Sequence, residues 1–162
     1  MLTAFALIIF IIEAQLPPLT PIPGIKLGLV NVITLFTLAA VGRKEAFTVM
    51  VLRVILGSIF AGGFMSFIYS FAGALVCFAL MAAALLFMNE NMIWCVSVLG
   101  AIGHNTGQMI TALAVTRTLQ ILWYLPVLMI SAVVTGLFTG LIAQSVLKHG
   151  GGVIKRMINK EK

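Results

Sequence analysis

Apolar residues in this chain run together in long stretches separated by short polar breaks. Several of the stretches approach or exceed the roughly 20 residues needed to cross the hydrocarbon core of a bilayer. They cover about residues 2–14, 27–41, 46–63, 64–87, 92–116 and 121–147. The stretches are too long and too continuously apolar for the strands of a barrel, and backbone groups in hydrocarbon must otherwise bond within helices. The pattern therefore predicts an all-α integral membrane protein, a single bundle of six transmembrane helices.

The lengths and boundaries of some of these stretches need comment. The first two are short, about 20 to 25 Å by the helical rise, so they must tilt little or extend into flanking residues. The third and fourth are separated only by Ala61-Gly62-Gly63, which is the weakest boundary. The first stretch has no basic residues before it and is followed by Pro17-Pro18 instead of a small-residue cleavage site, so we interpret it as a span and not as a signal peptide.

The break between the first two stretches, residues 13–28, is the most unusual part of the chain. It contains four prolines, two glycines, a carboxylate (Glu13) and a lysine (Lys26). Because proline has no amide hydrogen and a fixed φ, such a loop is a stiff, preformed cover. Glu13, Pro23, Gly24 and Lys26 are accordingly candidate ligand-binding residues.

Composition agrees with the membrane setting. Hydrophobic residues make up 62% of the 162 residues, charged residues only 9%, and the mean hydropathy is +1.19. A soluble domain cannot hide that much apolar surface.

The net charge of +6 is interpreted as topology rather than as nucleic-acid binding. Six spans place both termini on one side, and if that side is the cytoplasm, seven basic residues lie inside and two outside, as the positive-inside rule requires. The inner residues are Arg43, Lys44, Lys148, Lys155, Arg156, Lys160 and Lys162, and the outer ones are Lys26 and Arg117. We therefore predict a multi-pass protein of the cytoplasmic membrane with both termini cytoplasmic. The basic tail, residues 148–162, is expected on the anionic inner leaflet.

No catalytic or metal-binding pattern is present in the sequence. Cys77 and Cys95 are single cysteines in different apolar stretches, and both are interpreted as small hydrophobic residues. The chain contains no aspartate, so the aspartate-rich magnesium sites of prenyl diphosphate chemistry are absent. These observations predict a protein that is not an enzyme and has no metal or cofactor.

Polar residues inside the apolar stretches are the remaining candidates for a site, because they are costly in lipid and by default face the bundle interior. On the predicted topology they come from several helices and converge on the outer half of the membrane, beneath the loop. They are Glu13, Asn31, Arg53, His104, Asn105 and Gln108. Each has a structural alternative: Glu13 pairing with Arg53, for example, or Asn31 bonding a neighbouring helix.

Residues 103–108 point to a ligand more strongly than the others. Three strong hydrogen-bonding side chains in five residues, His104, Asn105 and Gln108, exceed what packing needs. Gly103 and Gly107 flank them and leave room for a close helix approach or for a ligand. Tyr69, Trp123 and Tyr124 fall near the outer boundary as interface anchors, with cavity lining as the alternative, and Tyr69 is included among the candidate binding residues.

Four blocks of this sequence resemble the small bacterial membrane family called heptaprenyl diphosphate synthase component I, or the Gx transporter family. They are Ile22–Asn31, Arg53–Gly57, Tyr69–Gly73 and Gly103–Gln108, in the same order and over nearly the whole chain. That family is similar to the substrate-binding S components of energy-coupling factor (ECF) transporters. The resemblance implies six helices, a ligand near the outer face beneath the first loop, and reorientation of the protein when it docks on a T component with its ATPases.

The chain departs from the S components at one point. Their first helix commonly carries an Ala-xxx-Ala docking pattern, whereas Ala4, Ala6 and Ala14 are not four residues apart. A shared coupling module, a dedicated one and a solitary role therefore stay open.

Three functions remain at this point: an importer subunit that binds substrate, a membrane-anchoring partner of a soluble heptaprenyl diphosphate synthase in menaquinone side-chain synthesis, and a membrane enzyme. The first is preferred, and the family's synthase name is taken to reflect association with a true synthase. The expected ligand is a small amphiphilic anion, because Lys26, Arg53, Arg117 and a protonated His104 offer positive charge beside apolar walls. A quinone or isoprenoid precursor and a vitamin-like or haem-like carboxylate fit equally well.

Overall fold

The computed structural model describes residues 2–15, 30–61 and 63–158, and this part of the chain is all-helical, as the sequence predicts. It contains six α-helices and two short 3-10 helices. The α-helices are α1 (Leu2–Gln15), α2 (Asn31–Ala40), α3 (Arg43–Ala61), α4 (Gly63–Ala84), α5 (Ile93–Thr116) and α6 (Leu125–Ile158), and the 3-10 helices are η1 (Glu90–Met92) and η2 (Leu119–Tyr124).

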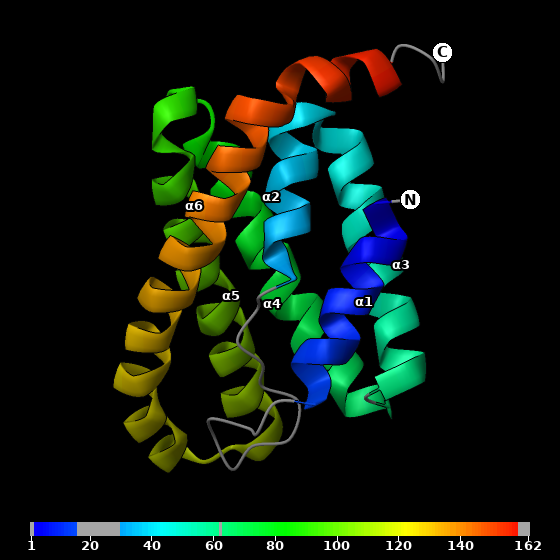
Figure 1. Cartoon of the computed structure of the whole chain (residues 1–162). Helices are drawn as coiled ribbons and strands as arrows, with labels where there is room; N and C mark the ends of the chain where they lie inside the picture. Colours follow the sequence, from blue (N-terminus) through cyan, green and yellow to red (C-terminus); the bar gives the residue numbers. More distant parts are fainter. Residues whose placement is uncertain (1, 16–29, 62, 159–162) are drawn as a thin grey trace.

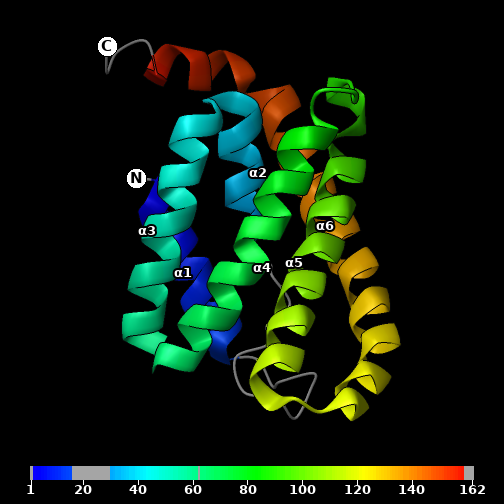
Figure 2. The same ribbon diagram turned by 180° about the vertical axis from the view of Figure 1, so that it is seen from behind.

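The helices form one bundle in which α3, α4, α5 and α6 run alternately up and down (Figures 1 and 2). The short helix α2 lies in the middle of the bundle and contacts each of the other five α-helices. At ten residues it is only about 15 Å long, so its first residue, Asn31, lies inside the bundle rather than at an end. The position of α2 therefore brings a polar side chain into the interior.

Glycines let the backbones of α4, α5 and α6 approach closely. A Cβ atom on Gly107 of α5 would lie 2.7 Å from the Ala72 carbonyl oxygen of α4. Likewise, a Cβ on Gly140 of α6 would lie 2.7 Å from the Trp94 Cα of α5. Backbone atoms cannot give way to a side chain at these distances, so α5 is fixed on both sides. Of the two uses that the sequence allowed for Gly107, close helix approach is the one observed.

The helix bounds differ from the predicted stretches at several ends, and two of these ends carry charged residues. Helix α3 begins at Arg43, three residues before the predicted start, because Arg43, Lys44 and Glu45 are good helix formers. Helix α6 continues to Ile158, although the sequence pattern ends the span at residue 147. Its last part turns away from the bundle axis and lies across the ends of α2 and α3, a bend that coincides with the glycines at 150–152 (Figures 1 and 2).

Two helical segments of the described chain, Gly63–Ala84 and Leu119–His149, are long and apolar enough to cross a membrane. Helices α1 and α2 have only 14 and 10 residues, which is shorter than a typical span. Helix α3 starts with three charged residues and carries Arg53, and α5 carries the polar group at 104–108. Two apolar helices of this kind are compatible with membrane association, and the six-span arrangement stays a prediction.

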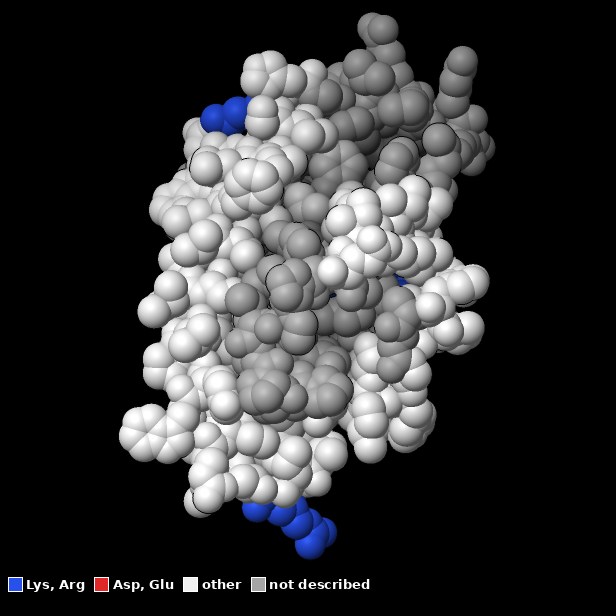
Figure 3. Space-filling view, turned by 60° about the horizontal axis from the view of Figure 1, so that its bottom comes forward, with Lys and Arg blue, Asp and Glu red and all other residues white. Residues whose placement is uncertain are grey.

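The surface of the described part is largely apolar. Large side chains such as Ile59, Phe64, Ile130 and Phe138 are each more than 60% exposed. In Figure 3, which brings the lower end of Figure 1 forward, Lys and Arg show only as isolated blue areas and no described acidic residue is visible. An apolar exposed surface of this extent suits contact with lipid.

Candidate ligand-binding site

A buried arginine is the central charged group of the interior. Arg53 lies near the middle of α3 and is only 1% exposed. One of its terminal nitrogens donates a hydrogen bond of 2.9 Å to the Asn31 side-chain oxygen at the start of α2. The two residues proposed from separate stretches of sequence are therefore in contact. The structural alternative for Asn31, a bond to a neighbouring helix, is realised by this same contact.

A segment of α4, residues 73–77, lies between Arg53 and helix α5. Val54, the residue after Arg53, packs in one cluster with Ala74 of this segment. On the other side of the segment, a Cβ atom on Gly73 would lie 2.9 Å from both His104 Nδ1 and Gln108 Cγ. Because Gly73 has no side chain, it leaves the space that these two residues of α5 occupy. One layer of the bundle thus contains Arg53, His104 and Gln108.

Gln108 has the most unusual environment of these residues. Its side chain is completely buried, and neither its Nε2 nor its Oε1 has a hydrogen-bond partner among the described residues. The Asn31 Nδ2 also has no hydrogen-bond partner among the described residues, whereas the Asn31 oxygen accepts a bond from Arg53. Buried amides nearly always have partners, since an unsatisfied group costs about 1 to 3 kcal/mol. A buried amide with neither polar atom bonded, as in Gln108, is therefore a feature that packing alone does not explain.

Asn105 points in a different direction from its neighbours in sequence. Its Nδ2 donates a 2.7 Å hydrogen bond to the Leu128 carbonyl oxygen of α6. The residue therefore holds α5 and α6 together, although its own oxygen has no partner in the described chain. Of the three polar residues at 104–108, the structure brings two to the α4 side and one to the α6 side.

Tyr69 lies inside the bundle and is only 4% exposed, so its interpretation as an interface anchor is wrong. It packs in a cluster with Met109, Ala112 and Leu128. Tyr69 lies one helical turn before Gly73 on α4, so this apolar cluster lies next to the polar layer. Trp123, by contrast, is 84% exposed at the end of the bundle.

Buried hydroxyl groups that the sequence reasoning missed add to this interior. Ser66 and Ser70 of α4 are 2% and 3% exposed, and they share a helix face with Gly73. Thr34 of α2 is 1% exposed, one turn after Asn31. The Ser66 and Thr34 hydroxyls have no hydrogen-bond partner among the described residues. The spacing of Ser66, Ser70 and Gly73 on one face is the sequence pattern that could have identified them.

Four of the predicted site residues cannot be placed. Pro23, Gly24 and Lys26 lie outside the described residues, and so does the side chain of Glu13. The polar centre is defined here by residues that are described: Asn31, Thr34, Arg53, Ser66, Ser70, His104 and Gln108.

The polar centre has the chemistry of a binding site for an anionic group. A guanidinium offers planar paired donors to phosphate or carboxylate, and amide and hydroxyl groups complete such a headgroup's hydrogen bonds. The described residues contain no group of three or more His, Cys, Asp or Glu that could hold a metal ion.

Comparison with known proteins gives one match. No curated protein and no solved structure matches the chain. The model of one protein family, described as heptaprenyl diphosphate synthase component I, matches residues 2–146, which is most of the chain. This protein belongs to the heptaprenyl diphosphate synthase component I family.

Proposed function

We propose that this chain is a membrane-embedded binding component of a prenyl diphosphate system, and that it holds an amphiphilic anion in its polar centre. The observation that carries the proposal is the Gln108 amide, which is fully buried beside His104 without a hydrogen-bond partner among the described residues. A bound headgroup supplies the missing partners and faces the guanidinium of Arg53. The prenyl portion of such a ligand suits apolar walls such as Tyr69 and Met109.

The binding of a prenyl diphosphate can be tested directly. Native mass spectrometry of the protein as extracted should reveal a co-purifying small molecule, and labelled farnesyl diphosphate should bind the purified chain. Gln108→Leu should weaken binding about tenfold, since a hydrogen bond to a charged group is worth about 1.5 to 3 kcal/mol. Ser97→Ala, a buried polar change on the α6 side of α5, is the matched control and should bind normally. Equal binding by both variants would rule out the polar centre as the site.

The proposal includes the six-span topology with both termini in the cytoplasm. It is supported by the exposed basic residues Arg43, Lys44 and Lys148, which lie at the end of the bundle opposite Arg117. An impermeant maleimide should label Arg117→Cys in intact cells and Lys148→Cys only after lysis. Labelling of both from outside would contradict this topology.

The family match favours a role beside a soluble prenyl synthase. The matched family is described as one component of a heptaprenyl diphosphate synthase, and a component implies a partner subunit. The exposed basic residues Arg43 and Lys44 offer that partner a cytoplasmic surface. A soluble prenyl synthase should therefore sediment with membranes that contain this chain and be released by the double variant Arg43→Gln, Lys44→Gln. Sedimentation that is unchanged by the double variant would count against this surface.

A second candidate is an S component of an ECF-type importer, which would capture the same kind of ligand from outside. The observation that favours it is the placement of Asn31 at the N-terminus of α2, inside the bundle, with α2 extending from there toward the basic end. This function requires a T component and ATPase subunits. Their co-purification with the chain supports the importer, whereas a soluble synthase in the same fraction supports the partner role.

A further inference from the structure

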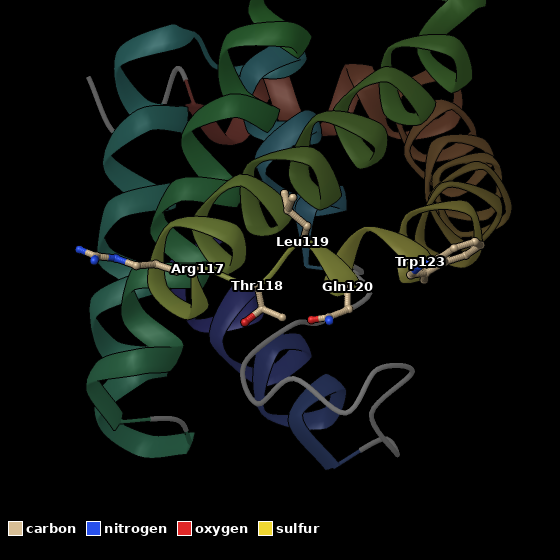
Figure 4. A pocket seen from close by; sticks show the side chains of 5 residues that line it. All are labelled: Arg117, Thr118, Leu119, Gln120 and Trp123. Carbon is tan, nitrogen blue, oxygen red and sulfur yellow. The ribbon is translucent and has the colours of Figure 1, made fainter.

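A groove lies at the lower end of the bundle, where α5 passes into α6. It has a volume of about 490 Å³ and is lined by Arg117, Thr118, Leu119, Gln120 and Trp123. These residues follow directly on the last residue of α5, and the last three belong to η2. Figure 4 shows Arg117 extending outward at one edge, Trp123 at the other, and the polar ends of Thr118 and Gln120 between them. The groove is separate from the polar centre and shares no residue with it.

Arg117, which carries the positive charge of the groove, has an unusual backbone conformation. Arg117 has φ 52° and ψ 30°, the left-handed conformation that ends a helix, and its amide nitrogen bonds the Leu113 carbonyl oxygen at 2.9 Å. Glycine is the usual residue there, because a side chain in this conformation costs about 1 to 2 kcal/mol. Arg117 is also exposed, while the other exposed basic side chains of the described chain, Arg43, Lys44 and Lys148, lie at the opposite end.

Two residues give the groove an apolar edge that suits a membrane boundary. Leu119 and Trp123 are 77% and 84% exposed. The candidate membrane span Leu119–His149 begins within the groove. Tryptophan at the end of a span is typical of the interface between headgroups and hydrocarbon. A charged edge, two polar groups and an apolar edge therefore follow one another at the level where a lipid changes from headgroup to chain.

We propose that this groove binds the headgroup of an anionic phospholipid. Arg117 pairs with the phosphate, and the Gln120 amide donates to its oxygens. The Thr118 hydroxyl already donates to the Thr116 carbonyl oxygen at 2.9 Å, so it is left to accept from a headgroup hydroxyl. Leu119 and Trp123 contact the chains. A free phosphate would gain nothing from these two exposed apolar side chains, which is why the groove is assigned to a lipid. The inference rests on the proposed membrane setting.

The two tryptophans of the chain make this site measurable. Trp94→Phe leaves Trp123 as a single fluorescent reporter in the groove. The protein is reconstituted in phosphatidylcholine bilayers that contain a minor fraction of brominated phosphatidylglycerol or brominated phosphatidylcholine. Phosphatidylglycerol should bind beside Trp123 about fivefold more tightly, as expected for one arginine near an anionic surface.

Substitutions of Arg117, the C-terminal cap of α5, can separate the effect of its charge on lipid binding from its effect on the fold. Arg117→Asn removes the charge, and asparagine tolerates the left-handed conformation, so it should abolish the lipid preference without unfolding the chain. Arg117→Lys should keep part of the preference. Lys148→Asn removes a charge at the opposite end and should leave the preference intact.

Three outcomes would overturn the proposal, each in a different way. Equal quenching by both brominated lipids would mean that the groove does not select anionic lipid, while the membrane setting stands. Quenching by neither lipid would mean that Trp123 does not face a bilayer, and the membrane setting would fail with it. Loss of the preference when inorganic phosphate replaces chloride at equal ionic strength would assign the groove to a small anion.

Discussion

Helix α5 carries some buried polar groups that contact α6 and others that lie toward α4, and the two sets differ in their hydrogen bonding. On the side toward α6, the Ser97 and Thr139 hydroxyls lie 2.9 Å apart, and the Asn105 amide nitrogen bonds the Leu128 carbonyl oxygen. We call this face the α5–α6 seam. On the side toward α4, Gln108 is just as deeply buried, yet its amide has no hydrogen-bond partner among the described residues.

The backbone packing of the two faces does not explain this difference. Both use glycines, Gly107 toward α4 and Gly140 on α6, and in both a Cβ atom would lie 2.7 Å from backbone of the neighbouring helix. The faces are equally close and differ in their hydrogen bonding. Ser97, Thr139 and Asn105 each make at least one hydrogen bond, although the Asn105 oxygen has no partner among the described residues. Neither polar atom of the Gln108 side chain has one there. Satisfied groups in a membrane bundle act as packing contacts, whereas unsatisfied ones indicate a position that something else completes.

The largest expected effect is on ligand binding at the α4 side. Arg53→Met should lower the affinity for farnesyl diphosphate about a hundredfold, because it removes the buried guanidinium and its charge-assisted hydrogen bonds. Arg53→Lys should recover only part of the affinity, since an ammonium lacks the planar paired donors. Lys148→Asn removes an exposed charge instead and serves as the control in the same equilibrium binding measurement. A normal affinity for Arg53→Met would remove the reason for calling this face a site.

Added methyl groups should destabilise both faces of α5 by similar amounts. Gly107→Ala and Gly140→Ala should each cost about 2 kcal/mol of stability, because the new Cβ meets backbone atoms that cannot move freely. Thermal unfolding in detergent measures the change, and Ala114→Leu at an exposed position of α5 is the control. If one variant is stabilised, as Gly→Ala is in an uncrowded helix, that face is less tightly packed than the distances indicate.

Replacing one amide on each face by leucine should change stability in opposite directions. Gln108→Leu removes an unsatisfied buried amide and should stabilise the ligand-free protein by about 1 kcal/mol. Asn105→Leu removes the hydrogen bond to Leu128 and should destabilise it by about 1.5 kcal/mol. Both are measured by thermal unfolding after the ligand has been removed. Destabilisation by both would mean that Gln108 is a packing residue like Asn105.

The helices follow from the sequence more readily than the site does. Long runs without proline or a charged residue predict α4 and α5 to within a few residues. The continuation of α6 to Ile158 was missed because three successive glycines and several charges resemble the end of a helix. The turn of the last part of α6 away from the bundle axis is a feature of the whole fold that local sequence does not carry (Figure 1).

Within the site, the sequence predicts which strongly polar residues are buried, but it does not predict which neighbouring helix each side chain faces. Arg53 and Gln108 could be identified because strongly polar residues are rare and costly in apolar stretches. Asn105 shares that property, and only the positions of the neighbouring helices decide that it faces α6. Ser66 and Ser70 were missed because small hydroxyls are common in helices and often bond their own backbone. Sequence spacing defines the faces of a helix, and packing decides which face is the site.

The smallest expected effect is a coupling within the α5–α6 seam. Thr139 Oγ1 donates to the Thr135 carbonyl oxygen at 2.7 Å, so in its contact with Ser97 it must accept and Ser97 must donate. A double-mutant cycle of Ser97→Ala and Thr139→Val should therefore show a coupling energy of about 1 kcal/mol in thermal unfolding. The same cycle between Ser97→Ala and Gln108→Leu should show no coupling, because these residues are about 16 Å apart along α5. A coupling near zero in the first cycle would mean that the seam hydroxyls are neighbours without a stabilising bond. The contrast with Gln108 would then rest on Asn105 alone.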